Sequence, residues 1–305
     1  MRARHGRDEF KADYTRGLLL RGAPTPLAKP DTRPRGALGE RLALRCYQVV
    51  QRAHLLESPL GRGAFQVGYR LYKRHGSDPY RTLVRTRPGL FSGGHILDIG
   101  ANIGYTASLF AEALTGNAQV FAFEPEPRSY AALSRLAQRS RGRITAIPSA
   151  VGERLGEAQL ALNDLHPADH RIAASEAPSP EMARRTALRV PMTTVDAFLA
   201  ERGVAPNEVR FIKIDVQGYE AHVIDGMRHA LAAARRLALT LEYDPQLLRE
   251  AGRSGTTLLH DLGQLGFSTL YLLHPRTAPA RITLEALARA MGERPYCDLL
   301  LLNGR

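Results

Sequence analysis

The sequence predicts an α/β fold: a seven-stranded, mostly parallel sheet with one antiparallel edge strand and helices on both faces. The first observation is that short apolar runs alternate with helical patterns from about residue 95 onward, which is typical of parallel strands joined by helices. The second is that the chain closes on two apolar runs, 267–273 and 297–302, with one short helical pattern between them. Continued strand–helix alternation would give only parallel strands, so this ending indicates that the final strand is reversed.

The apolar pattern gives the elements in chain order. Strands are expected at 96–99, 120–123, 144–148, 211–216, 237–242, 267–273 and 297–302. Helices are expected at 106–114, 129–138, 194–202, 218–234, 256–265 and 284–291. Ser129 is the expected N-cap of the second helix, because a serine hydroxyl can accept a hydrogen bond from a free backbone N–H. Residues 152–190 interrupt the pattern because they are polar and rich in Pro and Ala, and we interpret them as a short hairpin followed by a mobile insertion.

The first 90 residues do not alternate in this way. Residues 1–36 contain four prolines among charged side chains and are predicted to lack fixed structure. Residues 37–90 are predicted to form a helical extension that starts with a helix near 38–56. Residues 91–305 then form the α/β domain, with the insertion 152–190 inside it.

The N-terminal segment is strongly basic. Residues 1–50 carry 11 Lys and Arg against five acids, which is half of the chain's formal net charge of +12. Such a leader could touch an anionic surface, although a solvated arginine-rich tail is the simpler interpretation. The pattern shows no stacking platform for single-stranded nucleic acid, so no nucleic-acid partner is expected.

Composition also bounds the compartment. Cys46 and Cys297 are far apart in the chain and do not suggest a disulfide framework. No apolar run approaches the roughly 18 residues of a membrane span or the about 7–15 residues of a signal-peptide core. We therefore expect a cytoplasmic protein without a transmembrane segment; its oligomeric state is not indicated.

The most informative motif is a turn between the first strand and the first helix. It reads D-x-G-x-N-x-G, with Asp98, Gly100, Asn102 and Gly104 at its fixed positions. Glycines let the backbone come close to a ligand, and the helix that follows offers free N–H groups. The motif departs from the G-x-G-x-x-G of dinucleotide sites, and an acid suits an ammonium or hydroxyls better than a diphosphate. S-adenosylmethionine carries both of these groups, whereas the alternative is an ordinary strand–turn–helix.

A second acid stands at the distance that a ribose ligand requires. Glu124 ends the second strand, about 20 residues after the first glycine of the turn, where a carboxylate can accept hydrogen bonds from both ribose hydroxyls. Taken alone, a solvated Glu at a strand end would be the simpler reading. The turn upstream makes the ribose-binding reading stronger.

A third acid ends the fourth strand. Asp215 follows the apolar run 211–214, and Glu242 ends the fifth strand. Because ligands of open α/β sheets bind outside the carboxyl ends of the strands, these two acids should share one crevice with Asp98 and Glu124. Asp215 is the candidate base, or the group that orients the hydroxyl of an acceptor, whereas Glu220 is expected to support the start of the next helix.

Two further ideas concern the same crevice. His170 lies in the 152–190 insertion and could act as a base near neutral pH, although a solvated loop histidine is the more common case. Oxygen ligands from Asp215, Glu242 and Asp244 could suit Mg²⁺. No ligand spacing in the sequence calls for a metal, so none is predicted.

Six segments between residues 98 and 227 carry a family resemblance. They are DIGANIGYTASLFA (98–111), FAFEPEP (121–127), SAVGE (149–153), DHRI (169–172), VPMTTVDAFL (190–199) and FIKIDVQGYEAHVIDGM (211–227). Together they resemble the FkbM family of S-adenosylmethionine-dependent methyltransferases over roughly residues 90–275. The resemblance implies a class I methyltransferase, Rossmann-like fold and, for most members, O-methylation of a sugar, glycolipid or polyketide-type natural product.

The resemblance also implies roles for single residues. Asp98, Gly100, Asn102 and Gly104 would hold the methionine part of the cofactor, and Glu124 would hold its ribose. Ser149 and Ala150 would border the adenine, while Asp215 and His170 would face the acceptor. The chain departs from the family in one place, where Gln217 stands at a position that is usually Glu; the loss of that acid could change the acceptor or lower activity.

The expected reaction is therefore transfer of a methyl group to a hydroxyl of a small-molecule or glycan acceptor in one SN2 step. The protein would supply proximity, alignment and deprotonation. One alternative is a non-catalytic or regulatory binding module on the same fold. A less favoured alternative is an NAD-dependent oxidoreductase, because the dinucleotide fingerprint is missing.

Overall fold

The computed structural model describes residues 78–163, 169–173, 182–292 and 295–303. The chain divides into two units, 1–50 and 51–305, and all described residues belong to the second. The predicted leader at 1–36 and the predicted helix at 38–56 lie outside the described residues. The described part of the extension 37–90 contains a helix, α4 (Pro79–Thr86).

The described chain forms one large mixed sheet of eight strands. Their order across the sheet is β11 (Ala280–Arg281), β10 (Thr269–Leu272), β12 (Cys297–Leu302), β9 (Ala238–Tyr243), β8 (Val209–Ile214), β1 (His95–Ile99), β2 (Val120–Phe123) and β3 (Ile144–Ile147). Five adjacent strands of this sheet run parallel to one another: β9, β8, β1, β2 and β3. The prediction of a mostly parallel α/β sheet is confirmed.

The place of the reversed strand differs from the prediction. β12 runs antiparallel to β9 and to β10, so it lies inside the sheet, and the two-residue β11 forms the edge beside β10. β10 therefore runs in the same direction as β9 but one strand away from it. The segment after β10 is long enough to hold β11 and α12 (Leu284–Met291), which lets the chain return and fill the gap with its last strand.

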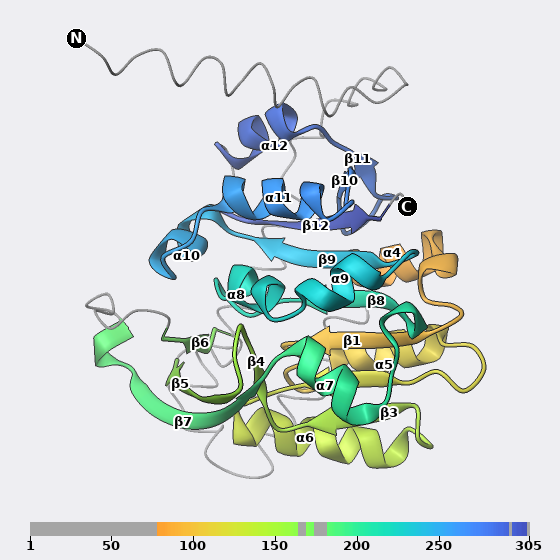
Figure 1. The fold of residues 1–305 in the computed structure, drawn as a ribbon, viewed down its shortest axis with the longest axis vertical. Helices are drawn as coiled ribbons and strands as arrows, with labels where there is room; N and C mark the ends of the chain where they lie inside the picture. The colour runs from red at the N-terminus through yellow and green to blue at the C-terminus, as the bar shows by residue number, and fades with distance from the viewer. Residues whose placement is uncertain (1–77, 164–168, 174–181, 293–294, 304–305) are drawn as a thin grey trace. The chain divides into compact units, whose positions relative to one another are not determined.

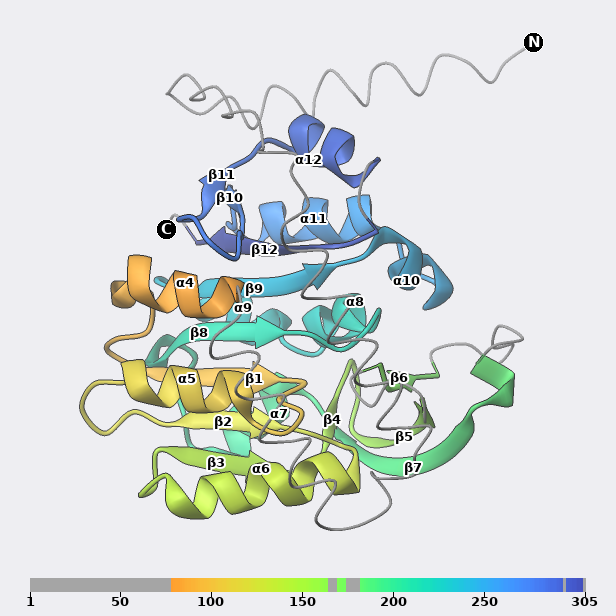
Figure 2. The same cartoon turned by 180° about the vertical axis from the view of Figure 1, so that it is seen from behind.

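Helices cover both faces of the sheet, as predicted. On one face, α4, α5 (Tyr105–Ala113) and α6 (Pro127–Arg139) contribute to an apolar cluster with the alternate strand residue Ile96; α4 and α5 lie in front in Figure 2. The other face has α7 (Val195–Arg202), α8 (Glu220–Asp225), α9 (Arg228–Ala233), α10 (Pro245–Glu250) and α11 (Gly255–Gln264). There, Leu97 and Ile99 join the second cluster, because successive strand residues point to opposite faces.

Two helices differ from the prediction for local reasons. α6 begins at Pro127, whose missing N–H costs nothing in a first turn, and Glu126 caps it by accepting from Arg128 N and Ser129 N. Ser129 is therefore not the N-cap. The single helix predicted at 218–234 is divided into α8 and α9 near Gly226, where a Cβ atom would lie 1.9 Å from the carbonyl oxygen of Gly152.

The segment 152–190 is more regular than predicted. It contributes to a second sheet whose order is β4 (Ala150–Val151), β7 (Thr186–Thr193), β5 (Gly156–Leu162) and β6 (Arg171–Ile172). β5 and β6 form the expected hairpin contact, but β5 also pairs with β7 over its whole length. The described part of the insertion is therefore mainly sheet, while residues 164–168 and 174–181 lie outside the described residues.

The second sheet flanks the end of the large sheet at which the parallel strands finish. In Figure 1 the arrowhead of β1 points toward the side on which β4 and β5 lie. Short 3-10 turns complete the described fold at Pro88–Leu90, Met182–Arg184 and Pro206–Glu208. Among the described helices, none has the length and apolar character needed to cross a bilayer.

Candidate active site

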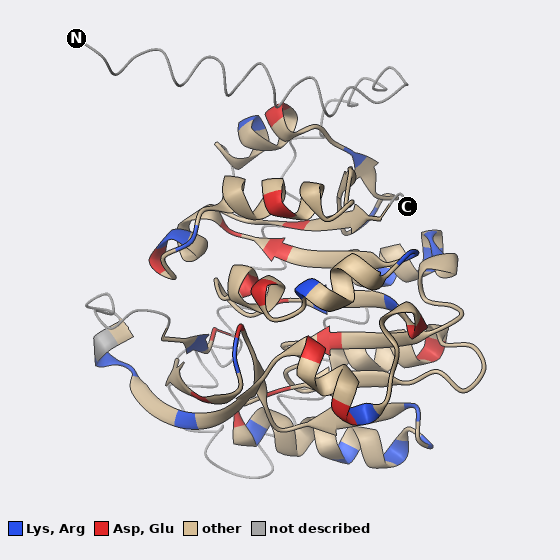
Figure 3. Ribbon diagram, in the orientation of Figure 1, with Lys and Arg blue, Asp and Glu red and all other residues tan. Residues whose placement is uncertain are grey.

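The four acids predicted to share a crevice lie at the same end of four adjacent strands. Asp98 and Glu242 are the penultimate residues of β1 and β9, and Glu124 and Asp215 directly follow β2 and β8; acidic residues at the tips of β1 and β9 are red in Figure 3. Asp98 has no exposed surface and Glu124 is 7% exposed. The side chain of Asp215 is 36% exposed, so it is the acid best placed to meet a second molecule.

A buried lysine that the sequence reasoning missed connects two of these acids. Lys213 in β8 is only 2% exposed, and its Nζ lies 3.1 Å from Asp98 Oδ1 and 3.5 Å from Asp215 Oδ2. It also donates to the carbonyl oxygen of Gly100 at 3.0 Å. Burial alone disfavours the ammonium, but Asp98 and Asp215 outweigh it and raise the pKa of Lys213 above its ordinary value.

The glycines of the turn serve the packing of the protein itself. A Cβ atom at Gly100 would lie 1.9 Å from Asp215 O, and one at Gly104 would lie 2.5 Å from a methyl carbon of Leu136. Both glycines also have positive φ, at 79° and 87°. Side chains at these two positions would therefore clash with Asp215 after β8 and with α6, while the contact of the glycines with a cofactor stays a prediction.

The N–H groups of the turn also have partners within the chain. Gly100 N and Ala101 N both donate to Phe123 O, and Gly104 N donates to Ala101 O. Asn102 N donates to Glu124 Oε2 at 2.8 Å, from a residue with a φ of 50°. A phosphate would need such groups to be free, so the turn does not form a phosphate cradle.

Glu124 is held in a fixed position but keeps acceptor capacity. Its Oε2 accepts from Asn102 N at 2.8 Å, and its Oε1 accepts from Glu126 N at 2.9 Å. Burial, partly opposed by these two hydrogen bonds, raises the pKa of Glu124 to about 7. A carboxylate offers about four lone-pair sites, so one remains on each oxygen for a pair of hydroxyls.

Asp98 has partners within the chain. Its Oδ2 accepts from Thr106 Oγ1 at 2.7 Å, and its Oδ1 makes an ion pair with Lys213 but no hydrogen bond among the described residues. The side chain is fully buried. It therefore holds Thr106 and Lys213 in place from inside the protein. A role as the direct ligand of a cofactor stays a prediction.

The side-chain amide of Gln217 connects Asp215 and Glu242 by hydrogen bonds. Its Nε2 donates to Asp215 Oδ1 at 3.0 Å and to Glu242 Oε2 at 2.6 Å. Burial, followed by the charges of Asp215 and Asp298, raises the pKa of Glu242 to about 10. The ionised form of Glu242 is thus disfavoured in this pair, whereas the Asp215 side chain is 36% exposed.

Glu220 shapes the loop that carries these side chains, as expected for a structural residue. Its Oε1 accepts from Val216 N at 3.1 Å and from Gly218 N at 3.2 Å. The side chain is 1% exposed, and burial raises its pKa to about 7. The loop between β8 and α8 is thus tied to the helix that follows it.

The remaining predicted residues lie toward the second sheet. Ser149 is buried, and its Oγ lies 2.8 Å from Ala150 O and 3.2 Å from Pro191 O. Ala150 pairs with Met192 of β7. His170 directly precedes β6 and accepts a hydrogen bond at Nδ1 from Asn163 N at 3.0 Å, so it belongs to the second sheet rather than to the row of strand ends.

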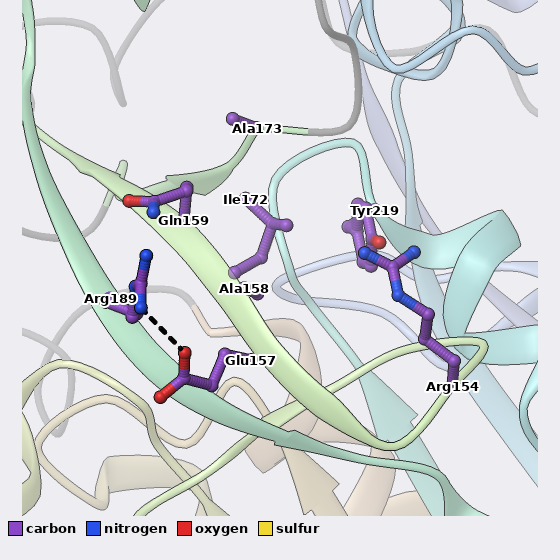
Figure 4. A pocket seen from close by; sticks show the side chains of 8 residues that line it. All are labelled: Arg154, Glu157, Ala158, Gln159, Ile172, Ala173, Arg189 and Tyr219. Atoms are coloured by element: carbon purple, nitrogen blue, oxygen red, sulfur yellow. Dashed lines mark ion pairs between the residues drawn. The ribbon is translucent and has the colours of Figure 1, made fainter.

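A hollow of about 270 Å³ opens on the second sheet. Figure 4 shows Arg154 and Tyr219 on one side of it, with Ile172 and Ala158 between them and the Arg189–Glu157 pair, whose charged atoms are 3.3 Å apart. Gln159 and Ala173 complete the lining. Tyr219 ends the loop that carries Asp215 and donates to Glu153 Oε2 at 2.9 Å, so the hollow and this loop share one residue.

No group of three or more His, Cys, Asp or Glu side chains in the described residues is arranged to hold a metal ion. Asp244, a conceivable metal ligand from the sequence, instead caps α10 by accepting from Gln246 N and Leu247 N. The other two conceivable ligands, Asp215 and Glu242, both accept hydrogen bonds from the amide of Gln217.

The sheet order places the chain in the class of open α/β folds, whose ligands generally bind outside the carboxyl ends of parallel strands. Sequence comparison then identifies the family. The model of the methyltransferase FkbM domain matches residues 98–266, more than half of the chain. The chain therefore belongs to the FkbM methyltransferase family. No curated protein matches it in sequence.

Several solved structures are similar at low identity. A methyltransferase FkbM from Methylobacillus flagellatus KT is 19% identical over 76% of this chain and 50% of its own, with a TM-score of 0.45; the chain thus matches half of that protein's length. A SAM-dependent O-methyltransferase from Thermotoga maritima is 12% identical over 73% of this chain and 64% of its own, with a TM-score of 0.36. A SAM-dependent methyltransferase from Aquifex aeolicus is 11% identical over 84% and 97%, with a TM-score of 0.37. Because these scores are below 0.5, the family assignment rests on the sequence match.

Proposed function

We propose that this protein transfers a methyl group from S-adenosylmethionine to a hydroxyl of a sugar, glycolipid or other natural product. The observation that carries the proposal is the placement of Glu124 and Asp215 on opposite sides of the β1 turn. The first has acceptor sites suited to a ribose. The side chain of the second is 36% exposed, and the loop that it begins continues to Tyr219 in the lining of the hollow. Membership of the FkbM family supports the same reaction class.

The residues at the strand ends fit the cofactor. Glu124 would accept from the two ribose hydroxyls through its unused lone pairs, and Asn102 would lie beside them in the turn. Ser149 and Ala150 would border the adenine, as the family resemblance implies. Asp98 would act through Thr106 and Lys213, which it holds in place. When bound, S-adenosylmethionine supplies a methyl group on a sulfonium. The sulfur leaves as a neutral thioether, so the leaving group needs no proton.

Asp215 would act on the acceptor. Its carboxylate would accept a hydrogen bond from the hydroxyl, align it for attack and take its proton as the new C–O bond forms. Lys213 stands 3.5 Å behind it and keeps a positive charge there, which stabilises the ionised carboxylate. His170 is the second candidate for the base, because it directly precedes β6, whose Ile172 lines the hollow.

The turn geometry disfavours the nicotinamide alternative. A dinucleotide places its pyrophosphate on free N–H groups at this turn. In this chain Gly100, Ala101 and Gly104 donate to other backbone atoms, and Asn102 donates to Glu124. A non-catalytic module would not require an exposed acid at the end of β8.

Asp215→Asn is expected to separate binding from turnover. Binding of S-adenosylhomocysteine, measured by calorimetry, should stay within about twofold of the unchanged protein. Transfer of tritiated methyl groups to a panel of sugars, glycolipids and hydroxylated natural products should fall about 100-fold or more, the usual size of a lost general base.

The matched control is Asp261→Asn, because the Asp261 side chain is 38% exposed on α11. Its activity should not change. An Asp215→Asn protein with full activity would remove Asp215 from the mechanism. A melting shift with NAD and none with S-adenosylmethionine would overturn the proposed reaction.

A further inference from the structure

The side chain of Gln217 occupies an unusual place in the site. One nitrogen atom donates to two carboxyl groups from different strands, 3.0 Å from Asp215 Oδ1 and 2.6 Å from Glu242 Oε2. The backbone of Gln217 has a φ of 55°, which is uncommon for a residue with a Cβ atom. Glu220 fixes this conformation by accepting from the N–H groups on either side, those of Val216 and Gly218.

The surroundings of Gln217 are rich in charge. Lys213 lies on the far side of Asp215, and Glu220 supports the loop from α8. Asp298 of β12 pairs with Glu242 across the sheet and accepts from Tyr80 of α4 at 3.3 Å. Asp215 and Glu242 therefore contact the Gln217 amide directly, while Asp298, Glu220 and Lys213 contact or neighbour the groups around it.

Carboxyl groups that converge in this way usually share a proton or bind a hard cation such as Mg²⁺. The amide nitrogen of Gln217 does something similar without charge, because it carries two hydrogens that can be directed at two acceptors. It lies at hydrogen-bond distance from both carboxyl groups and so bridges them.

We propose that Gln217 is a positioning residue whose amide takes the place of a divalent cation between Asp215 and Glu242. It holds Asp215 at the edge of the crevice and lets the two acids lie close together without metal. The consequence for methyl transfer, that the reaction needs no divalent cation, rests on the function proposed above. The structural part does not, because it concerns only this cluster.

Gln217→Glu tests the proposal by placing a third carboxyl group between the first two. The new group should have a folded-state pKa above its unfolded value, because the charge of Asp215 repels its ionised form. Its contribution to stability is therefore present at low pH and is lost as the pH rises through the folded-state pKa. We expect the melting temperature to be close to that of the unchanged protein at pH 5 and about 4 °C lower at pH 8.

Manganese is the probe that separates this role from simple packing. At pH 8, Mn²⁺ at about 1 mM should restore the melting temperature of Gln217→Glu, because three carboxyl groups then form a set of oxygen ligands. The electron paramagnetic resonance signal of Mn²⁺ should show one ion bound to each Gln217→Glu molecule. Gln217→Met, which has a similar size and no donor, should be destabilised equally at all pH values and should not be rescued by Mn²⁺.

The matched control is Gln246→Glu. Gln246 on α10 is exposed and donates to one carboxylate, Glu250, at 3.0 Å, so the same change should produce no Mn²⁺ site. If the unchanged protein binds one Mn²⁺ and Asp215→Asn abolishes that binding, a cation shares the site and the proposal is wrong. If Gln217→Glu does not fold, two other measurements still test the proposal. One is Mn²⁺ binding by the unchanged protein and by Asp215→Asn, and the other is the stability of Gln217→Met with and without Mn²⁺. None of these measurements uses a methyl donor or acceptor, so they stand apart from the test of the proposed function.

Discussion

At the scale of single residues, Glu124 couples the ligand site to pH. Burial raises its pKa to about 7, against the pull of two backbone N–H groups that favour the ionised form. Near neutral pH the carboxyl group is therefore partly protonated. Two ribose hydroxyls that donate to it would favour the ionised form, so binding of the cofactor should release a proton.

We expect S-adenosylhomocysteine to release about half a proton per site at pH 7, and Glu124→Gln to abolish this release. Calorimetry in buffers with different heats of ionisation measures the number directly. The folded-state pKa of Glu124 is raised, so its contribution to stability falls as the pH rises from about 5 to about 8. The melting temperature of Glu124→Gln should therefore improve relative to the unchanged protein over that range. Glu112→Gln, an exposed change on α5, is the control; equal proton release in all three proteins would place the ribose elsewhere.

These residues show what the sequence could and could not predict about the site. Asp98, Glu124, Asp215 and Glu242 were predicted together, because parallel strands end at one edge of a sheet. Lys213 was missed, although a lysine within an apolar strand suggests a buried partner. The bridge made by Gln217 could not be predicted, because it depends on a positive φ and on the distance between two strands that are far apart in sequence.

At the scale of elements, the second sheet is the part that the local pattern described least well. β5 pairs with β7 from Gly156 opposite Met192 to Leu162 opposite Thr186, a contact between the first and last parts of the insertion 152–190. Only alternation within a strand is visible in a sequence, so the hairpin was predicted and the wider sheet was not. Its inner face packs on Tyr219, which joins the hollow to the loop of Asp215.

Ala173→Trp is expected to fill this hollow, because Ala173 lies in its lining after β6. Binding of S-adenosylhomocysteine should not change, whereas methyl transfer to an acceptor found in the panel should fall about tenfold or more, because the acceptor could no longer be aligned. Ala187→Trp adds the same side chain at an exposed position of β7 and should leave transfer intact. Equal activity of both variants would show that the acceptor binds elsewhere.

At the scale of the whole molecule, the last strand completes both the core and the polar cluster. β12 pairs with six residues of β9 and four of β10. Leu299 and Leu301 pack on one face of the sheet and Leu300 on the other. Asp298 accepts a hydrogen bond from Tyr80 of α4. The described N-terminal helix and the C-terminal strand therefore meet at the edge of the candidate site.

A chain that ends after Gly292 should lose the fold. Burial of Leu299, Leu300 and Leu301 contributes about 5–9 kcal/mol at 1.5–3 kcal/mol for each side chain, which approaches the whole stability of a typical domain. Removal of β12 would also leave the edges of β9 and β10 unpaired, and exposed edges promote aggregation. Urea unfolding followed by circular dichroism should show no cooperative transition, and gel filtration should show aggregates. A chain that ends after Asn303 keeps β12 and the bond from Asn303 N to Leu237 O, and should unfold like the full chain. A cooperative transition in the shorter protein would mean that the parallel strands form a stable sheet without the reversed one.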